Sequence, residues 1–530
     1  MTSVTTGGSG SSAVAAVPRA VWIVFIGLMI GNALSSLDST VVATALPTIV
    51  GDLHGIRDLS WLATSYLLAA MVSTPLYGKL GDLYGRKRIF LFALLTFLAG
   101  SVMCGMAQSM TQLIAFRALQ GLGAGGLMSL PFAILGDLVP TRDLAKFIGY
   151  SSLVFLISSV GGPILGGLFA EHLSWRLVFY INVPLGLASF FIVSRYLHAP
   201  VKRTEHKIDY QGAFLLVAAI TSFVLMTSWG GTREPWGSST IIGLGAATVL
   251  FAVLFVFRER HAPEPVLPGR MFRTGTARLA SGINFMTGLA FWPALYFTAA
   301  FLQYVHGVDP GVAGVFVAPF MAGAVGGNLI SGRAIARSGT YRTWPILGGI
   351  FCIVGGVLLG LSHTATPLVV MLGGAGVVGF GIGFTMQTVL LVAQNEVELR
   401  DIGVATSTTF LARQMGGTVA LAALGGLLNN RLAFWIPRLT PADAHLDLAK
   451  LRGTPQKIRE LAPAVSHGVI DAFSRSLSTV FWCLVPIGIV WLVLALLLRN
   501  KPLRSDEVVD IDAHDDTGLA ATALEGHGGF

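Results

Sequence analysis

The sequence predicts an all-α integral membrane protein with about fourteen transmembrane helices. Three observations support this fold class. Of the 530 residues, 53% are hydrophobic and only 12% are charged, with a mean hydropathy of +0.72, whereas about 25% of the residues of a soluble protein are charged. Apolar stretches long enough to cross about 30 Å of hydrocarbon recur along the chain. Short basic loops between these stretches hold most of the excess of Lys and Arg, so the net charge of +8 does not predict nucleic-acid binding.

The apolar stretches define the predicted spans and their grouping. The spans are predicted to begin near Ala20, Ser60, Ile89, Thr111, Leu144, Trp175, Gln211, Ser239, Ala277, Val312, Trp344, Pro367, Gly403 and Ser478. We expect an N-terminal six-helix half over residues 20–198, two inserted linker helices over 211–257 and a C-terminal six-helix half over 277–498. The C-terminal half is expected to contain an extracytoplasmic loop, 429–477, whose residues 446–462 form a short amphipathic helix hairpin.

Charge in the short loops predicts the orientation of the helices. Cytoplasmic loops carry an excess of Lys and Arg, and the basic loops 78–88, 201–207 and 258–273 fall on one side of the predicted membrane. This side is therefore predicted to be cytoplasmic, and an even number of spans places both termini there. Residues 1–19 and 505–530 are expected to be disordered cytoplasmic tails. We expect a multi-pass protein of the inner (plasma) membrane of the cell.

An internal repeat supports the two-half arrangement. Gly78 and Gly85 are seven residues apart in the loop after the second span, and Gly332 and Gly339 are also seven apart, 254 positions later. The second pair again lies in a predicted cytoplasmic loop with basic neighbours. Parallel repeats of this kind indicate a secondary transporter with its binding site at the interface of the two halves.

Asp38 and Arg117 are charged residues inside otherwise apolar spans. A carboxylate at the middle of a membrane helix costs roughly 2.5–3.5 kcal/mol on insertion scales, which points to function. At a rise of 1.5 Å per residue, Asp38 lies roughly 12 Å and Arg117 roughly 9 Å from the outer ends of their spans. We expect them to share a polar cluster, either as a direct pair or through water and hydroxyl groups. The alternative is that Arg117 extends outward to the interface and that water solvates Asp38.

A lone embedded acid suggests proton coupling. Desolvation favours the protonated form of a carboxyl group, whereas a nearby guanidinium favours its charged form. If this balance differs between inward-open and outward-open states, the proton is taken up on one side and released on the other. Asp38 is therefore the predicted proton carrier, with Arg117 as its partner.

The loop "GKLGDLYGRKR" (78–88) is the first of several motifs with a wider resemblance. Its glycines permit a tight turn between closely packed helix ends, and its acid can cap a helix or accept from an arginine. The motif resembles the signature loop between helices two and three of the major facilitator superfamily. The resemblance implies a gating role for Gly78, Gly81, Asp82, Gly85 and Arg86. The alternative is a plain turn whose basic residues only set the orientation.

The stretch "SSVGGPILGGLFA" (158–170) lies in the fifth predicted span. Proline removes a backbone hydrogen bond and small residues let helices approach, so the stretch is at least a kinked packing face. It also resembles the antiporter motif of the superfamily, which is typical of exporters. The resemblance implies this role for Gly162, Pro163, Gly166 and Gly167.

Further motifs extend the resemblance from about residue 20 to 500. They are "LDSTVVATALP" (37–47), "WRLVFYINVPLG" (175–186) and "RDIGVATSTTFLARQMGGTVA" (400–420). With about fourteen spans, the chain resembles the fourteen-spanner drug:proton antiporter branch of the superfamily, the multidrug efflux type. This resemblance implies an exporter that works by alternating access, and it implicates Asp38 and Arg117 in coupling.

The C-terminal half supplies the candidate substrate cavity. Arg413 matches an arginine of this branch, and no embedded acid of the second half is available to pair with it. Gln387, a backbone carbonyl or an anionic group of the substrate could accept from its guanidinium. Trp292 corresponds to Asp38 under the repeat offset, and with Tyr296 and Asn284 it belongs to an aromatic-rich span. Such a stripe is more often packing than a pocket, but rings turned inward would suit lipophilic or cationic compounds.

These features favour proton-coupled efflux of lipophilic or cationic compounds, as in a multidrug or antibiotic exporter. An exporter of an endogenous lipid, siderophore or secondary metabolite remains the alternative, and antibiotic resistance without a metabolite phenotype would favour the former. A passive channel would need Asp38 and Arg117 only to wet a pore, and uphill transport distinguishes the two. The sequence has no phosphate-binding loop that would indicate ATP-driven transport. It also has no His cluster or serine motif that would indicate an enzyme.

The expected partners are a small lipophilic molecule, protons and the lipid bilayer, without nucleic acid. We expect no cofactor and no metal site, since the three cysteines fall in separate apolar runs without metal spacing. The expected oligomeric state is a monomer.

Overall fold

The protein is all-helical throughout the residues that the structure describes. The computed structural model describes residues 19–53, 59–139, 141–197, 209–231, 234–262, 275–308, 318–398, 401–441, 458, 461–501 and 503. These ranges contain long helices and one isolated bridge between Gly230 and Glu234, but no β-strand. The prediction of an all-α membrane protein is confirmed at this level.

The first seven helices come from residues 19 to 196. They are α1 (Arg19–Asp52), α2 (Leu59–Tyr84), α3 (Arg86–Met106), α4 (Met110–Leu138), α5 (Thr141–His172), α6 (Leu177–Tyr180) and α7 (Asn182–Tyr196). Their sequences are apolar on nearly all sides, as expected of helices surrounded by lipid and by other helices. Polar residues mark where helices begin: the side chain of Ser109 caps α4 by accepting from the backbone N–H of Gln112.

The remaining helices come from residues 210 to 497. They are α8 (Tyr210–Trp229), α9 (Ser239–His261), α10 (Gly275–Tyr304), α12 (Ala318–Ser338), α13 (Thr343–Gly360), α14 (Leu368–Asn395), α15 (Ile402–Leu439), α17 (Pro463–Trp482) and α18 (Leu484–Leu497). Asp209 and Ser238 cap α8 and α9 through their side chains. The predicted start of the tenth span at Val312 lies outside the described residues.

Eleven helical segments among the described residues are long and apolar enough to cross a membrane. Two of them join neighbouring helices, Leu177–Tyr196 (α6 and α7) and Pro463–Leu497 (α17 and α18). Helices α2, α5 and α12 have 26, 32 and 21 residues but are not among the eleven. The count of fourteen spans therefore stays a prediction, as does the grouping into two halves of six helices.

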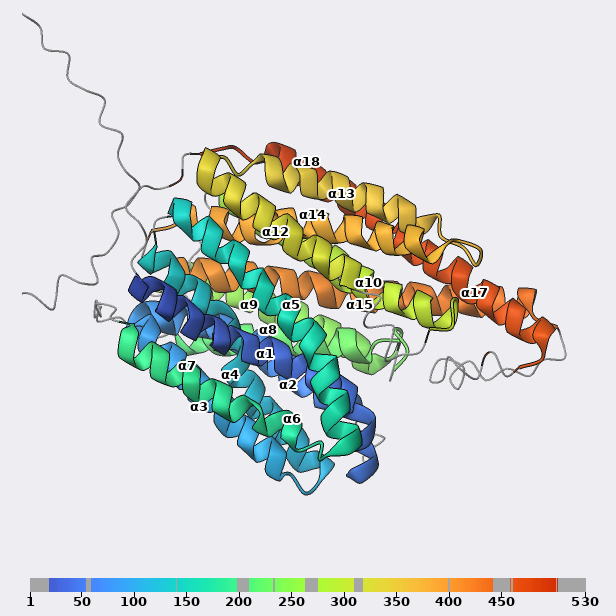
Figure 1. Ribbon diagram of the computed structural model, residues 1–530, viewed down its shortest axis with the longest axis horizontal. Coiled ribbons are helices and arrows are strands. Elements are labelled where there is room, and N and C mark those ends of the chain that lie inside the picture. Colours follow the sequence, from blue (N-terminus) through green and yellow to red (C-terminus); the bar gives the residue numbers. More distant parts are fainter. Residues whose placement is uncertain are drawn as a thin grey trace, which may run out of the picture.

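The helices pack in two groups, which are separated in Figure 1 by colour. In the N-terminal group (α1–α7), α1 packs on α5 and α7, and α4 packs on α2 and α3. In the C-terminal group (α10–α18), α14 packs on α12 and α13, and α15 on α10 and α17. Helices α8 and α9 pack on each other, and α8 also contacts α2 and α15.

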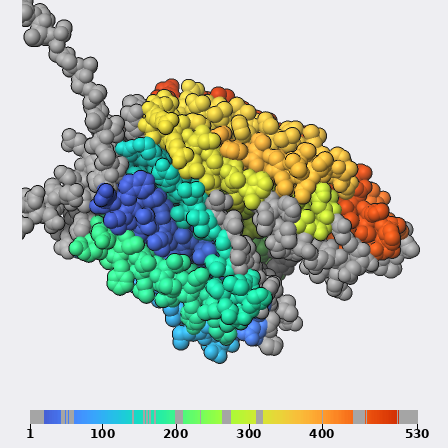
Figure 2. Space-filling view, viewed as in Figure 1, coloured from blue at the N-terminus to red at the C-terminus, as the bar shows by residue number. Residues whose placement is uncertain are grey.

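The two groups touch along two seams. One seam is between α2 and α15, with α4 also against α15, and the other is between α5 and α12. Figure 1 shows that α1 begins and α18 ends at the same end of the bundle, which we call the terminal end. In Figure 2 the blue-to-green lobe and the yellow-to-red lobe meet at this end and spread apart toward the opposite end.

The repeated glycines occupy matching turns. Gly85 lies between α2 and α3 with φ of 92°, and Gly339 lies between α12 and α13 with φ of 70°. Only glycine adopts such left-handed conformations without strain. The spacing that the sequence repeats thus corresponds to the same backbone turn in both groups of helices.

The predicted loop 429–477 is shorter in the structure. α15 continues to Leu439 and α17 begins at Pro463, so both helices extend into the residues assigned to the loop. Hydropathy marks only the roughly 20 residues of a helix that lie in hydrocarbon. α15 has 38 residues and, at 1.5 Å per residue, is about 57 Å long. Most of the predicted hairpin 446–462 lies outside the described residues.

Candidate functional site

Asp38 of α1 and Arg117 of α4 form a direct ion pair. Arg117 Nη1 lies 2.5 Å from Asp38 Oδ2, and the two residues are 1% and 2% exposed. The structure thus brings together the two charges that the sequence places at a similar depth, and the arginine does not extend outward. Their attraction is strong in a low-dielectric interior, but it has to offset the cost of removing both charges from water.

Neutral polar groups complete the surroundings of the carboxylate. Gln120 Nε2 and Asn182 Nδ2 donate to Asp38 Oδ1 over 2.8 and 3.1 Å. The same two amide groups donate to Ser101 Oγ over 3.2 and 2.9 Å, and Gln120 Oε1 accepts from Arg117 Nη1 over 2.9 Å. Both carboxylate oxygens are therefore bonded, and protonation of Asp38 would weaken several charge-assisted bonds at once.

Helix geometry explains why four helices converge here. Arg117 and Gln120 are three residues apart on α4, so their side chains leave the same face. The break between α6 and α7 places Asn182 at the first residue of α7. Ser101 of α3 donates to the carbonyl of Phe179 in α6 over 2.8 Å, which fixes this break against the cluster.

Helix α2 holds the arginine from the other side. The guanidinium of Arg117 lies 4.1 Å from the centroid of the Tyr66 ring, and its Nε donates to the carbonyl of Leu62 over 3.5 Å. Tyr66 in turn donates from its hydroxyl to the carbonyl of Ser35 on α1 over 3.1 Å. This close packing of α2 on α4 requires a small residue, because a Cβ at Gly121 would overlap the carbonyl oxygen of Tyr66.

Sequence reasoning missed the neutral members of this cluster, Ser101, Gln120 and Asn182. One of them, Asn182, lies in a motif that carries the family resemblance. Gln120 is one helical turn after Arg117, and Asn182 lies in "WRLVFYINVPLG" (175–186). A polar residue one turn from an embedded charge was the signal that could have identified Gln120.

The antiporter motif packs against the turn of α1 that carries the acid. A Cβ at Gly162 would overlap Thr40 Oγ1, and that hydroxyl donates to the carbonyl of Ser158 over 3.0 Å. Thr40 is two residues from Asp38. A shift of α5 therefore bears directly on the position of the carboxylate.

The other residues of the motif have different surroundings. Gly166 is buried in the α5 helix, whereas a Cβ at Gly167 would meet no described atom within 4 Å. The side chain of Pro163 lies outside what the structure describes, and the predicted kink stays a prediction.

Asp82 at the end of α2 caps the start of α15. Its Oδ1 accepts from the backbone N–H of Gly403 over 3.2 Å and its Oδ2 from that of Val404 over 3.0 Å. Arg86 Nη2 donates to Asp82 Oδ1 over 2.6 Å. The first N–H groups of a helix lack partners within the helix and carry a partial positive charge. The carboxylate therefore links the two groups of helices at the terminal end.

The rest of the gating loop supports this link. Arg86 also contacts Asp137 Oδ2 over 2.5 Å and donates to the carbonyl of Ala133 over 2.8 Å, both on α4. A Cβ at Gly78 would overlap the hydroxyl of Ser407 on α15, so this glycine permits the contact between α2 and α15. Gly81 packs against Leu130 and Arg86, and Gly85 makes the turn.

The candidates of the second half separate into two places. Asn284, Gln387 and Arg413 line one small cavity between α10, α14 and α15. Trp292 and Tyr296 are not among its lining residues. The ring of Trp292 lies where a Cβ at Gly417 of α15 would be, and Tyr296 is 55% exposed. Of the three acceptors considered for Arg413, Gln387 does not accept from it in this structure, since Gln387 Oε1 has no partner among the described residues.

Comparisons with known proteins identify the family. The sequence profile of the Major Facilitator Superfamily matches residues 28–421. The chain belongs to the Major Facilitator Superfamily. It is 36% identical to Multidrug resistance protein 3 of Bacillus subtilis (strain 168) over 90% of this chain and 95% of that protein. It is also 31% identical to Multidrug transporter protein MdtP of the same organism, over 95% and 97% of the two chains.

Solved structures agree with this assignment. The proton:xylose symporter XylE, bound to 6-bromo-6-deoxy-D-glucose, superposes with a TM-score of 0.62 over 94% of this chain and 100% of that chain, at 11% identity. This likeness shows the superfamily fold alone. Because members of the superfamily are transporters, the prediction of a transporter rather than an enzyme is confirmed, as is the resemblance drawn from the motifs.

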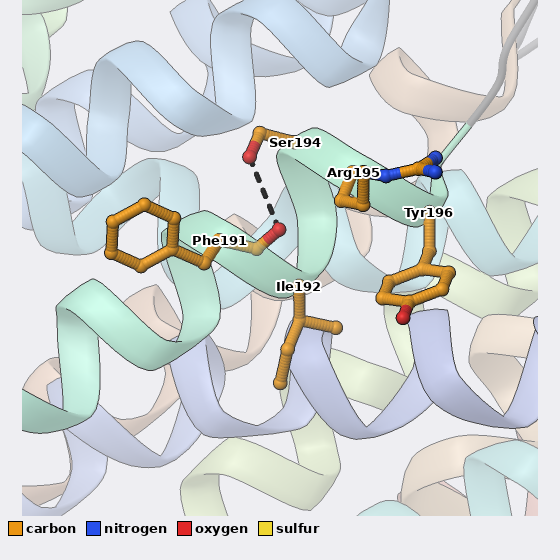
Figure 3. A pocket seen from close by; sticks show the side chains of 5 residues that line it. All are labelled: Phe191, Ile192, Ser194, Arg195 and Tyr196. Carbon is orange, nitrogen blue, oxygen red and sulfur yellow. Dashed lines mark hydrogen bonds between the residues drawn. The ribbon is translucent and has the colours of Figure 1, made fainter.

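A surface pocket on α7 holds none of the predicted site residues. It has a volume of about 470 Å³ and is lined by Phe191, Ile192, Ser194, Arg195 and Tyr196. Figure 3 shows these side chains spread around the helix, with the Ser194 hydroxyl bonded to the carbonyl of Phe191. Phe191 is 66% exposed. In this superfamily member the pocket is an open groove on the helix surface, unlike the buried cluster around Asp38.

The described residues contain no group of three or more His, Cys, Asp or Glu that could hold a metal ion. Cys104 and Cys352 are buried free thiols, and Cys483 is partly buried. Cys104 contacts Gln120 Oε1 at 3.7 Å, so its thiol packs beside the Asp38 cluster.

Proposed function

We propose that this chain exports lipophilic or cationic small molecules in exchange for protons, with Asp38 as the proton carrier. Two six-helix halves with two inserted helices would alternate access to the two sides of the cell membrane, with both termini in the cytoplasm. The observation that carries this proposal is the buried Asp38–Arg117 pair in its shell of amide and hydroxyl groups.

The pair supports proton coupling because its two charges depend on each other. A buried arginine without its counter-ion is unfavourable by several kcal/mol. A proton on Asp38 would neutralise the carboxylate and leave Arg117 buried without a counter-ion. The protonated state therefore favours a rearrangement of α1 against α4. Access to water from one side would then decide where the proton is taken up and where it is released.

The Asp82 cap supports alternating access, because it joins the two groups of helices at the terminal end. Asp82 bonds the start of α15, and α5 contacts α12 at the same terminal end. If this end is cytoplasmic, as the loop charges predict, the contacts close the cytoplasmic side in this state. Transport would require them to break and re-form in each cycle.

The test is uphill transport by Asp38→Asn protein in proteoliposomes. With a pH gradient imposed and ethidium as the cationic lipophilic probe, we expect wild-type protein to accumulate the dye against its gradient. Asp38→Asn should lower this accumulation at least 100-fold, because asparagine cannot bind and release a proton. Binding of ethidium to the purified variant should remain within about 10-fold of the wild type.

Asp52→Asn is the matched control. Asp52 is the last residue of the same helix and is largely exposed, with contacts to Trp175 and Arg176. Its neutral variant should transport normally. Normal pH-driven accumulation by the Asp38→Asn protein would remove Asp38 from the coupling role.

A further inference from the structure

The cavity between α10, α14 and α15 contains a buried positive charge with no negative partner. No described residue forms an ion pair or hydrogen bond with the guanidinium of Arg413. Its guanidinium instead faces the ring of Phe410, whose centroid is 4.7 Å from Arg413 Cζ. An aromatic face attracts a cation, but only weakly compared with a carboxylate. A buried charge without a counter-ion is unfavourable, so the site is incomplete as it stands.

Two buried amide oxygens in the same cavity also lack partners. Asn284 is 1% exposed and Gln387 is 6% exposed, and neither Asn284 Oδ1 nor Gln387 Oε1 has a hydrogen-bond donor among the described residues. The orientation of Asn284 is fixed, because its Nδ2 donates to the carbonyl of Thr409 over 2.6 Å. An unsatisfied buried acceptor costs about 1–3 kcal/mol, so a hydrogen-bond donor of a ligand would bind favourably to these oxygens.

The position of the cavity places it where a substrate could reach it. The ring of Phe410, which lines the cavity, lies 5.4 Å from that of Phe132 on α4 of the N-terminal group. The cavity therefore borders the seam between the two groups of helices. Arg413 is held firmly there, because its carbonyl oxygen lies where a Cβ at Gly288 of α10 would be.

The size of the cavity limits what it can hold. In this state the cavity has no room for a water molecule, whereas pockets for drug-sized ligands measure about 300–1,000 Å³. Binding of a ligand group therefore requires the lining side chains, Phe410 and Met386 among them, to move apart.

We propose that this cavity binds the anionic group of a lipophilic substrate, namely a carboxylate with an adjacent N–H or O–H donor. The carboxylate pairs with Arg413, and the donor bonds Asn284 Oδ1 or Gln387 Oε1. The inference rests on the proposed export function and gives lipophilic acids a subsite that cations such as ethidium do not use. A cationic group in the same cavity would be repelled by Arg413.

The test compares three dansyl probes that differ in charge at one position. Dansyl-phenylalanine carries a carboxylate next to a sulfonamide N–H, and dansyl-phenylalaninamide is neutral. The N2-dansyl derivative of 3-phenylpropane-1,2-diamine carries a cationic aminomethyl group in place of the carboxylate and keeps the phenyl ring. Their binding to the purified protein in detergent is followed by dansyl fluorescence. We expect the carboxylate to bind at least 10-fold more tightly than the amide, and the cation to bind most weakly.

Substitutions assign this preference to the cavity. Arg413→Gln should abolish the preference for carboxylate over amide, and Arg413→Lys should keep part of it. Arg438→Gln is the matched control, since Arg438 lies on the same helix, is exposed and also stacks on a phenylalanine ring. The Arg438→Gln protein should keep the preference for carboxylate over amide. Thermal unfolding should show that each variant is folded.

A second arm tests the donor. N-methylation of the dansyl-phenylalanine sulfonamide removes its N–H and should weaken binding to the wild type about 5-fold. Either the Asn284→Ala or the Gln387→Ala protein should bind the methylated and unmethylated probes within 2-fold of each other, because it lacks the oxygen that accepts the N–H. An unchanged 5-fold difference in Asn284→Ala and Gln387→Ala proteins would contradict the role of these oxygens.

Equal or tighter binding of the amide or the cation by the wild type would overturn the proposal, as would a carboxylate preference that survives Arg413→Gln. These outcomes are independent of proton coupling, because no pH gradient is present in detergent. The Asp38→Asn protein should keep the carboxylate preference. Failure of the proposed function would instead appear as normal uphill transport by that variant in proteoliposomes.

Discussion

The two groups of helices each bury an arginine, but they treat its charge differently. In the N-terminal group, Arg117 pairs with Asp38 inside a shell in which the carboxylate oxygens are bonded. In the C-terminal group, Arg413 faces an aromatic ring and shares a cavity with two amide oxygens that lack donors, and it has no acidic partner among the described residues. In the first cluster a proton can neutralise the carboxylate that pairs with the arginine. In the second, the arginine has no such partner and is available to an anionic group of a ligand.

The comparison suggests a division of labour within one fold. In the proposed mechanism the first cluster binds the coupled proton, since its charge changes through Asp38. The second cluster has fixed charge at all ordinary pH values, because an arginine keeps its proton. Its occupancy then depends on what enters the seam between the groups.

The largest expected effect separates the two arginines by their contribution to stability. Arg117→Gln leaves the Asp38 carboxylate buried without a counter-charge, and breaking a buried pair costs about 3–5 kcal/mol. We expect a clear drop in the unfolding temperature of the purified protein and loss of uphill transport. Arg413→Gln removes a charge that has no partner, so the unfolding temperature should stay the same or rise.

A double variant sharpens this comparison. Asp38→Asn with Arg117→Gln removes both charges and should recover most of the stability lost in Arg117→Gln, while uphill transport stays absent. Equal loss of stability in Arg117→Gln and Arg413→Gln would show that the pairing difference between the two clusters has no energetic consequence.

A smaller effect is expected at the α2–α15 seam, where Asp82 caps a helix of the other group. Asp82→Asn keeps one acceptor oxygen but loses the charge that favours the positive start of α15 and the Arg86 pair. We expect turnover to fall about 10-fold, with substrate affinity within 2-fold of the wild type, measured by transport and binding on the same preparation.

Asp143→Asn is the control for this seam. Asp143 pairs with Lys146 on the same helix, 2.9 Å away, and such partly exposed pairs contribute little. Its turnover should be unchanged. A fall in affinity equal to the fall in turnover for Asp82→Asn would place Asp82 in substrate binding rather than in gating.

The sequence predicts most of the fold because hydropathy and loop charge are local signals. The start of α9 at Ser239 is the predicted one, since an apolar run begins there directly after a capping serine. The end of α15 at Leu439 is not, because a helix that leaves the membrane continues with a mixed sequence that hydropathy does not distinguish from a loop. The repeated glycines are predictable because a positive φ restricts the residue type.

The candidate site is predictable only in its charged members. Asp38 and Arg117 stand out because charges inside spans are rare and costly. Ser101 and Asn182 do not stand out, since neutral polar residues are frequent in these spans and only the folded packing of α3 and α7 brings them to the carboxylate. On α15 the partners of Asp82 are the backbone N–H groups of Gly403 and Val404. A contact to the backbone does not depend on residue type and so cannot be predicted from the sequence.

The smallest expected effect is at the α5–α12 seam, where a neutral hydrogen bond joins the two helices. Asn328 Nδ2 of α12 donates to the hydroxyl of Ser152 on α5, and a Cβ at Gly332 would overlap the carbonyl of Ala145. A neutral hydrogen bond contributes about 0.5–1.5 kcal/mol, less than a charged cap. Asn328→Ala should therefore slow turnover only about 2-fold in proteoliposomes.

Asn430→Ala, at an exposed position of α15, controls for the loss of an asparagine and should transport normally. If Asn328→Ala slowed transport as much as Asp82→Asn, the two seams would contribute equally to closing the terminal end. The charge at Asp82 would then not be what makes one seam the stronger latch. A 2-fold effect beside a 10-fold effect would instead mean that the charged contacts of the α2–α15 seam contribute more to turnover than the neutral bond of the α5–α12 seam.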